Sequence, residues 1–162
     1  IWMPADGQHQ FYDKRHLFRM SGENDHYSAG TDQLIINYRG ARICPLICYD
    51  LRFPVFSRNK DLYDLALYVA NWPAARRQHW LTLLKARAIE NQSYIVGVNR
   101  IGRDGNDVDY CGDSLVVDFQ GNTLLDMDKT PGLQRISLSL EKLATYRTHF
   151  PAWKDGDSFT LM

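Results

Sequence analysis

The sequence predicts an α/β fold, a layered sandwich of strands and helices in one domain spanning residues 1–162. The first observation is that short apolar segments alternate with helical patterns along the chain, which is typical of layered α/β architectures. The second is the length, because 162 residues suit a single domain that is large enough to bury a core. No internal repeat or low-complexity linker divides the chain.

The first half of the chain is expected to hold four short strands. These strands are expected over Gln8–Tyr12, Gln33–Tyr38, Ala41–Cys48 and Leu65–Ala70. Between them we expect a polar loop with a possible short turn over Asp13–Gly30, a hairpin turn at Arg39-Gly40 and a short helix over Pro54–Asn59.

The second half is expected to begin with the strongest helix, Ala74–Asn91. In this segment Trp80, Leu81, Leu84 and Ala88 recur at three- and four-residue steps, which is the helical period. Further strands are expected over Tyr94–Asn99, Ser114–Asp118, Thr123–Asp126 and Gln134–Ser139. A last helix is expected over Leu140–His149, ending before Pro151.

The charge balance argues against two kinds of partner. Lys+Arg and Asp+Glu number 19 each, so the formal net charge is zero and no basic stripe points to nucleic acid. No apolar run approaches the roughly 20 residues of a membrane-spanning helix. We therefore expect neither nucleic acid nor a membrane as a partner.

The cysteines and histidines give no sign of a disulfide framework or a metal site. If Cys44 and Cys48 lie on one strand, four steps of about 3.3 Å separate them by roughly 13 Å, beyond the Cα distance of about 7 Å that a disulfide allows. Three cysteines without such a framework suit a reducing, cytoplasmic setting. The sequence has neither an HExxH motif nor a CxxC pair, so no metal site is expected.

Cys48 is the thiol whose position points to chemistry, although a lone cysteine in an apolar strand is more often a buried structural residue. It lies where the hydrophobic run ends, and α/β sheets place ligands at the carboxyl ends of their strands. The helix expected just beyond it would lower the pKa of the thiol. Cys44, beside Pro45 in mid-strand, is interpreted as core, and Cys111 is left without an assignment.

A nucleophilic thiol needs a base or a positive neighbour. His79 and His149 could supply a Cys–His pair, but neither has a local setting that marks it. Lys14, in the segment FYDKRHLF, suits a solvated turn charge when taken alone. Close to a thiolate, its ammonium group would stabilise that charge and donate to the oxyanion that forms when a carbonyl is attacked.

Four other residues are candidates for the pocket around such a thiol. Arg52 could form an ordinary exposed pair with Asp50 or could help to shape the pocket. Arg76, near the start of the long helix, could bind a carboxylate in a bidentate way or face solvent. Asn71 and Trp72 follow a buried strand and could line the mouth of the pocket, although Trp72 suits the core at least equally well.

Three motifs in order, FYDKRHLF, ENDHYSAG and LICYDLRFP, resemble the signatures of the nitrilase superfamily of carbon–nitrogen hydrolases. The resemblance continues through YVANWP, KARAIENQSYIVGVNRIG and GDSLVVDFQGNTL and so covers nearly the whole chain. Within the superfamily, the chain most resembles the bacterial omega-amidase branch, whose members deamidate 2-oxo acids such as 2-oxoglutaramate. Because several ordered motifs agree, this signal is far more specific than one cysteine.

The resemblance implies a four-layer α-β-β-α sandwich and a role for each motif residue. By position, Cys48 matches the nucleophile, Lys14 the lysine of the Glu–Lys–Cys triad, and Glu23 the second, supporting glutamate. The backbone N–H of Tyr49 matches one oxyanion donor. The resemblance also implies a small-molecule amide as substrate, no metal or organic cofactor, and a homodimer.

One part of the family pattern is not matched. The general-base glutamate of the superfamily lies in an N-terminal motif before the lysine, and the 13 residues before Lys14 contain no glutamate. We therefore expect the chain to be the C-terminal portion of such a domain, lacking the first βαβ elements of the sandwich. Two alternatives to an omega-amidase stay open: another amidase or carbamoylase of the superfamily, and an inactive remnant that serves as an interaction module.

Overall fold

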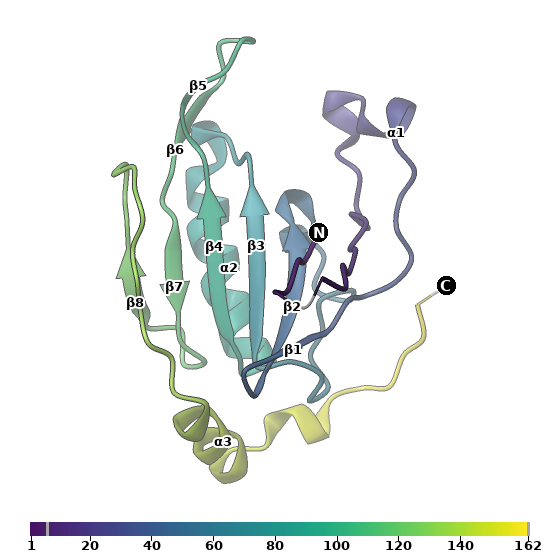
Figure 1. Cartoon of the computed structure of the whole chain (residues 1–162), viewed down its shortest axis with the longest axis vertical. Helices are drawn as coiled ribbons and strands as arrows, with labels where there is room; N and C mark the ends of the chain where they lie inside the picture. The colour runs from purple at the N-terminus through teal and green to yellow at the C-terminus, as the bar shows by residue number, and fades with distance from the viewer. Residues whose placement is uncertain (6, 162) are drawn as a thin grey trace.

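A mixed six-stranded sheet forms the centre of the computed structural model, which describes residues 1–5 and 7–161 (Figure 1). Along the sheet the strands are β1 (Ile36–Tyr38), β2 (Ala41–Ile47), β3 (Leu65–Ala70), β4 (Tyr94–Asn99), β7 (Leu115–Val117) and β8 (Thr123–Asp126). The central strands β2, β3 and β4 are parallel, whereas the pairs β1–β2, β4–β7 and β7–β8 are antiparallel. The predicted α/β class is confirmed.

Helix α2 (Arg77–Asn91) covers one face of this sheet, and a short 3-10 turn, η3 (Ala74–Arg76), leads into it (Figure 1). Most of its predicted apolar stripe is buried, with Trp80 and Leu84 facing the sheet, whereas Leu81 is half-buried. A Cβ atom on Gly97 of β4 would lie 2.6 Å from Leu84 Cδ1, so only glycine lets the helix approach this closely. No helix in the described part of the chain is long and apolar enough to cross a bilayer.

The opposite face of the sheet carries apolar side chains that the described residues leave partly open. Strand alternation directs Ile43, Leu67 and Val96 to this face, where they are half-buried, and Val69 and Val98 are each 46% exposed. The described residues thus form one helical layer and one sheet layer. The four-layer sandwich implied by the family resemblance stays a prediction.

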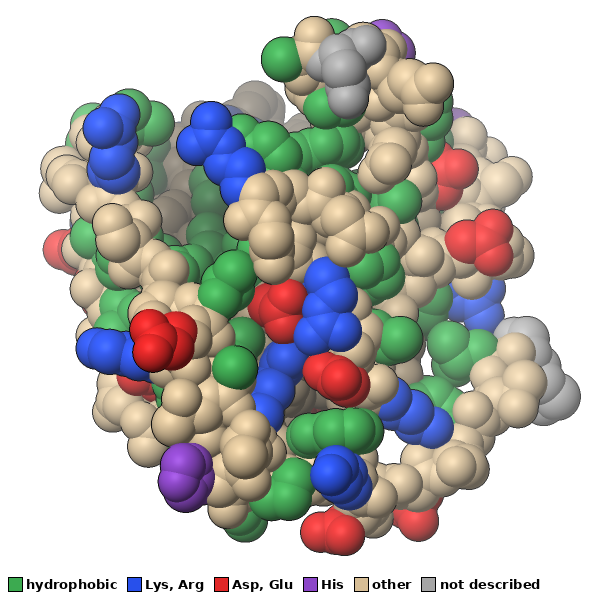
Figure 2. Space-filling view, turned by 60° about the horizontal axis from the view of Figure 1, so that its bottom comes forward, with side chains coloured by type: hydrophobic (Ala, Val, Ile, Leu, Met, Phe, Trp, Pro, Cys, Tyr) green, Lys and Arg blue, Asp and Glu red, His purple; other side chains and the backbone are tan. Residues whose placement is uncertain are grey.

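Helix α3 (Leu140–His149) lies below the lower end of the sheet, with the bounds that the sequence predicts (Figure 1). An ion-pair cluster attaches it: Asp64 Oδ1 accepts from Arg147 Nη1 at 2.9 Å and from Arg42 Nη2 at 2.7 Å. Arg147 also donates to the backbone oxygen of Tyr63 at 2.7 Å. Figure 2, which brings this end forward, shows basic and acidic side chains lying side by side near its centre.

Three expected elements are wrong. Gln8–Tyr12 makes only one isolated bridge, between Trp2 and Gln10, because Tyr12 is held through its side chain rather than through strand pairing. Gln134–Ser139 is not a strand, since Leu138 packs beside the small cluster around Leu143 instead. The helix expected over Pro54–Asn59 is a turn, and the helical turn comes earlier, as η2 (Cys48–Arg52).

Other elements differ in extent or were missed. The strands expected over Gln33–Tyr38, Ala41–Cys48 and Ser114–Asp118 are shorter than predicted, as β1, β2 and β7 show. The polar loop near the N-terminus holds the 3-10 turn η1 (Arg19–Ser21) and the one-turn helix α1 (Glu23–His26). A hairpin of β5 (Ile101–Arg103) and β6 (Asp109–Cys111) was not predicted.

Replacing Asp64 by asparagine should lower the free energy of unfolding by about 2 kcal/mol at neutral pH, because two partly buried guanidinium groups lose their carboxylate. Burial acts to raise the pKa of Asp64, but hydrogen bonds from Arg42 lower it overall. A lowered pKa stabilises the fold above the unfolded value of about 3.9 and ceases to do so as the pH falls through the folded value. The loss on Asp64→Asn should therefore shrink toward pH 3 in denaturant titrations.

Asp32→Asn is the matched control, because Asp32 is exposed. It should leave stability nearly unchanged at both pH values. An equal loss for Asp64→Asn at pH 3 and pH 7 would contradict the electrostatic role of Asp64.

Candidate active site

Cys48 lies directly after β2, at the carboxyl end of the parallel strands, as the sequence predicts. Its φ of +44° puts a non-glycine residue in the left-handed region, where the chain turns sharply from strand into η2. Such backbone strain occurs preferentially at functional sites. The sulfur lies 3.8 Å from the backbone oxygen of Asn71, a long contact to the end of the neighbouring strand.

A cavity of about 850 Å³ opens around this sulfur. Four segments supply its walls: the N-terminal loop, the turn after β2, the stretch after β3, and the β5–β6 hairpin. All eight residues that the sequence marks as candidates line this one cavity, namely Lys14, Glu23, Cys48, Tyr49, Arg52, Asn71, Trp72 and Arg76. The parallel strands thus bring together residues that are far apart in the sequence.

Lys14 and Glu23 form an ion pair within this cavity. Lys14 Nζ lies 2.6 Å from Glu23 Oε2, and the same oxygen accepts from the backbone N–H of Phe18 at 2.9 Å. Behind the lysine, the backbone N–H of Gly30 donates to the Lys14 carbonyl at 2.9 Å. A Cβ atom on Gly30 would lie 2.2 Å from the backbone oxygen of Asp13, so the two chain segments touch at their backbones.

The pKa of the Cys48 thiol is raised, contrary to the expectation that a following helix would lower it. Burial is the largest cause, and the carboxylates of Glu23 and Asp50 act in the same direction. The Lys14 ammonium group opposes them and lowers the pKa. Because η2 is a short 3-10 turn, its dipole does not offset the desolvation of the sulfur.

Asp50 is fully enclosed, which contradicts the interpretation of Asp50 and Arg52 as an exposed pair. It is 1% exposed and accepts hydrogen bonds from Tyr12, His16 and Ile47. The signal that sequence reasoning missed is its place as the third residue of a helical turn, where an acid caps the free backbone N–H groups.

Arg52 points instead along the cavity wall. Its guanidinium group lies 4.8 Å from the centre of the Trp72 ring, and Nη2 is 3.0 Å from His79 Nδ1. His149 Nδ1, on α3, lies 2.8 Å from the backbone oxygen of Thr145. Within the described residues, neither histidine is therefore in position to pair with the cysteine sulfur.

Trp72 is both buried and part of the cavity wall, so its two sequence interpretations hold together. Its backbone N–H donates to Asn99 Oδ1 at 2.7 Å, and its indole N–H donates to the Arg76 carbonyl at 2.9 Å. The Arg76 guanidinium group lies 5.5 Å from the centre of the Phe18 ring. In the described part of the chain, neither Arg52 nor Arg76 forms an ion pair with a carboxylate, so both cations are available to a ligand.

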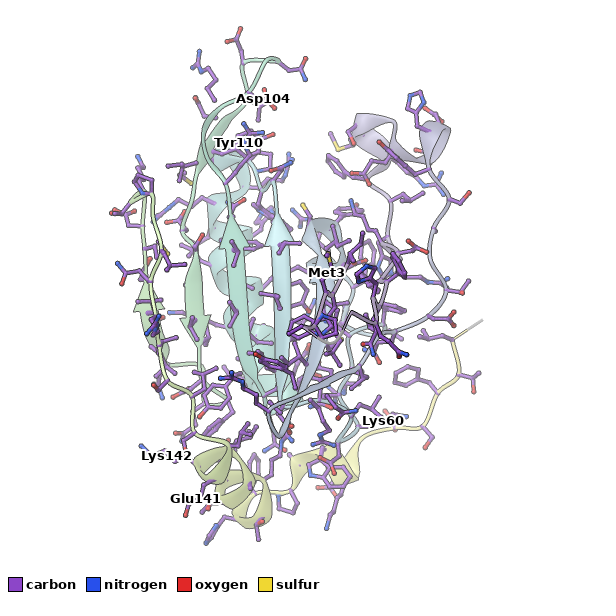
Figure 3. The ribbon with its side chains drawn as sticks, in the orientation of Figure 1. Met3, Lys60, Asp104, Tyr110, Glu141 and Lys142 are labelled. Carbon is purple, nitrogen blue, oxygen red and sulfur yellow. The ribbon has the colours of Figure 1, made fainter. Side chains whose placement is uncertain are left out.

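The β5–β6 hairpin is the wall that sequence reasoning missed. Tyr110 and Asp104 lie together above the carboxyl end of the sheet (Figure 3), and the Tyr110 hydroxyl donates to Asp104 Oδ2 at 2.9 Å. Backbone N–H groups of Val108 and Asn106 also donate to Asp104, and these bonds lower its pKa. The Asp-Gly-Asn-Asp run that starts at Asp104 is a turn signal that could have indicated the hairpin.

The remaining thiols are free, and none takes part in a metal cluster in the part of the chain that is described. Cys44 is fully buried in the core, as expected. Cys111 donates to Asp113 Oδ2 at 3.1 Å, and Arg77 binds the same carboxylate through two hydrogen bonds. Among residues 1–5 and 7–161, no three His, Cys, Asp or Glu side chains gather closely enough to hold a metal ion.

Comparison with known families agrees with the resemblance that the motifs indicate. The carbon-nitrogen hydrolase family matches residues 1–148. The chain belongs to this family.

Several relatives of the chain have named activities, and two of them illustrate the match. Omega-amidase YafV of Escherichia coli (strain K12) is 56% identical over 156 residues, which cover 96% of the chain and 61% of the relative. The 2-oxoglutaramate amidase of Bacillus subtilis (strain 168) is 34% identical over 146 residues, covering 89% of the chain and 56% of the relative. The chain thus spans about three fifths of the length of the relatives it matches.

Solved structures share the fold of this chain. XC1258 from Xanthomonas campestris, a CN-hydrolase superfamily protein with an arsenic adduct in its active site, superposes with a TM-score of 0.94 at 48% identity. That match covers 97% of this chain and 62% of the other. A mutant amidase from Nesterenkonia sp. AN1, whose active-site cysteine carries an acetamide moiety from fluoroacetamide, has a TM-score of 0.68 at 27% identity, covering 75% of this chain and 46% of the other.

Replacing Lys14 by alanine should shift the pH profile of Cys48 alkylation to higher pH. The ammonium group lowers the pKa of the thiol, so its removal raises that pKa and leaves less thiolate at any given pH. The measurement is the rate of iodoacetamide labelling of the Cys48 peptide across pH, followed by mass spectrometry. Lys85→Ala, on the exposed side of α2, is the control, and overlapping profiles for Lys14→Ala and the unaltered chain would refute the prediction.

Proposed function

We propose that this protein hydrolyses the amide of a small molecule through a thioester on Cys48. The observation that carries the proposal is the convergence, in one cavity, of a strained, strand-terminal cysteine and the Lys14–Glu23 ion pair. A cation beside a thiol serves both the thiolate and the oxyanion of an attacked carbonyl. Family membership and the named relatives support the same reaction class.

In the proposed reaction, the Cys48 thiolate attacks the amide carbonyl carbon and forms a tetrahedral intermediate. Lys14 Nζ and the backbone N–H of Tyr49 donate to the oxyanion. The carbon–nitrogen bond breaks, the amide nitrogen leaves as ammonia after taking up a proton, and a thioester remains on the sulfur. Water then cleaves the thioester, releasing the carboxylic acid and restoring the thiol.

The raised pKa of Cys48 means that its proton must pass to a base before attack. Glu23 binds Lys14 at 2.6 Å, and this suits the supporting role that the motif implies, in which it orients the lysine. The superfamily assigns the base to a glutamate in a motif that precedes the lysine. None of the 13 residues before Lys14 is a glutamate, so we assign this step to no residue of the chain.

The substrate class we favour is an amide that also carries a carboxylate, such as a 2-oxo-acid amide. Arg52 and Arg76 add two cations to the cavity, and Asp104 is already engaged by the hairpin. An anionic group on the substrate would complete their hydrogen bonding. The names omega-amidase and 2-oxoglutaramate amidase, given to relatives, point to such substrates.

Cys48→Ala should abolish ammonia release from 2-oxoglutaramate, because no other group on this path can hold the acyl intermediate. Lys14→Ala should lower kcat by about 10²–10³-fold, the usual cost of losing one oxyanion donor. Both variants are assayed for ammonia beside the unaltered protein, with Lys85→Ala as the matched lysine control. Turnover that survives Cys48→Ala would rule out the thioester route.

Arg76→Gln should raise KM for a carboxylate-bearing amide by about 10–100-fold, the equivalent of losing one charge-assisted hydrogen bond. A neutral amide of similar size should be affected much less, since it has no carboxylate for Arg76 to bind. Lys85→Gln, which removes a positive charge outside the cavity, is the control. Equal effects on anionic and neutral amides would contradict carboxylate recognition by Arg76.

A further inference from the structure

Lys14 belongs to a loop outside the sheet, whereas Cys48 ends a central strand, so something must hold the two in register. Hydrogen bonds around Asp50 provide this link. Tyr12 and His16 stand two positions before and two positions after Lys14, and Asp50 stands two positions after Cys48. The loop residues on both sides of the lysine therefore bind one carboxylate in the turn that presents the cysteine.

The contacts at this carboxylate are short and come from both segments. From the loop, the Tyr12 hydroxyl donates to Oδ2 at 2.7 Å, and His16 contacts Oδ1 through its backbone N–H at 2.9 Å and through Nδ1 at 2.8 Å. From the strand, the backbone N–H of Ile47 donates to Oδ2 at 3.0 Å. Asp50 thus joins the residue just before Cys48 to both flanks of Lys14.

The surroundings make this link difficult to break. Asp50 is 1% exposed, and a buried carboxylate without donors costs several kcal/mol. The His16 ring stacks on Phe53 at a centroid distance of 3.9 Å and packs edge-to-face with Phe56, which fixes the orientation of the ring toward the carboxylate. On the other side of the turn, Arg87 Nη2 donates to the Leu51 carbonyl at 2.6 Å and fixes η2 to helix α2.

We propose that Asp50 is a positioning residue that holds the Lys14 ammonium group at the Cys48 sulfur by binding both chain segments. The proposal rests on the proposed function only in the roles that it gives to these two side chains. Through Lys14 the same link extends to Glu23, 2.6 Å from the ammonium nitrogen. Asp50 touches no substrate in this scheme and acts through the lysine.

The alternative is a buried carboxylate that only stabilises the fold, as Asp64 does at the other end of the sheet. The two roles differ in their effect on the Cys48 thiol. The charge of Asp50 raises the thiol pKa directly, and the charge of Lys14 lowers it more strongly. Removing only the Asp50 charge therefore shifts the alkylation profile to lower pH, whereas releasing Lys14 shifts it to higher pH.

The decisive experiment is the pH profile of Cys48 alkylation in Asp50→Asn, Lys14→Ala and the double variant. Asparagine keeps the shape of Asp50 but turns one acceptor oxygen into a donor, which then faces either Tyr12 and Ile47 or His16. If Asp50 positions Lys14, Asp50→Asn alone shifts the alkylation profile to higher pH. In the Lys14→Ala background, where no lysine remains to be positioned, the same substitution leaves the profile unchanged or shifts it to lower pH. An unchanged or downward-shifted profile for the single variant, or an upward shift in both backgrounds, would overturn the proposal.

Two further variants keep the test independent of folding and of turnover. Tyr12→Phe removes one donor without adding a polar group, so it replaces Asp50→Asn in the cycle if that variant does not fold, and a smaller upward shift is expected. Asp64→Asn should lower stability without moving the profile.

Alkylation needs no substrate, so a protein that releases no ammonia would contradict the proposed function while leaving this result interpretable. Where turnover is measured, Asp50→Asn should lower kcat by about 10²-fold, with a smaller change in KM.

Discussion

The site depends first on the parallel pairing of β2 with β3. In the register of this pair, Ile47 lies opposite Val69, so the residues that follow the two strands emerge side by side at one edge of the sheet. Cys48 and Asn71 meet there for that reason, at 3.8 Å between sulfur and carbonyl oxygen. A parallel pair needs a long crossover connection, and α2 supplies it between β3 and β4 while covering one face of the sheet.

The charged residues of the cavity fall into two groups, those bound to other protein groups and those that form no ion pair within the described residues. Lys14 is bound to Glu23, and Asp104 is held by the backbone of its own hairpin. The guanidinium groups of Arg52 and Arg76 lie over aromatic rings. Stacking orients a guanidinium group without consuming its hydrogen-bonding edge. The cavity therefore combines a fixed ion pair with two oriented donors.

The sequence predicts most successfully where one signal dominates. Leu65–Ala70 and Tyr94–Asn99 have the predicted bounds because each is a continuous apolar run, which is typical of a strand covered by a helix. The helix Leu140–His149 is likewise correct, since Ser139 caps its start by accepting from Lys142 at 3.1 Å. All eight candidate residues chosen from the sequence line a single cavity in the fold.

Prediction fails where long-range contacts decide the outcome. Gln8–Tyr12 has a strand-like composition, but the Tyr12 side chain binds Asp50, 38 positions away, and nothing local announces that contact. Desolvation likewise depends on the whole fold, so the raised pKa of Cys48 could not be inferred from the adjacent helical turn. Gly30 makes one of these long-range contacts. Because it has no side chain, the returning loop can touch the backbone at Asp13, just before Lys14. The absence of a side chain at Gly30 therefore sets the distance between the backbone that carries Lys14 and the loop segment that returns beside it.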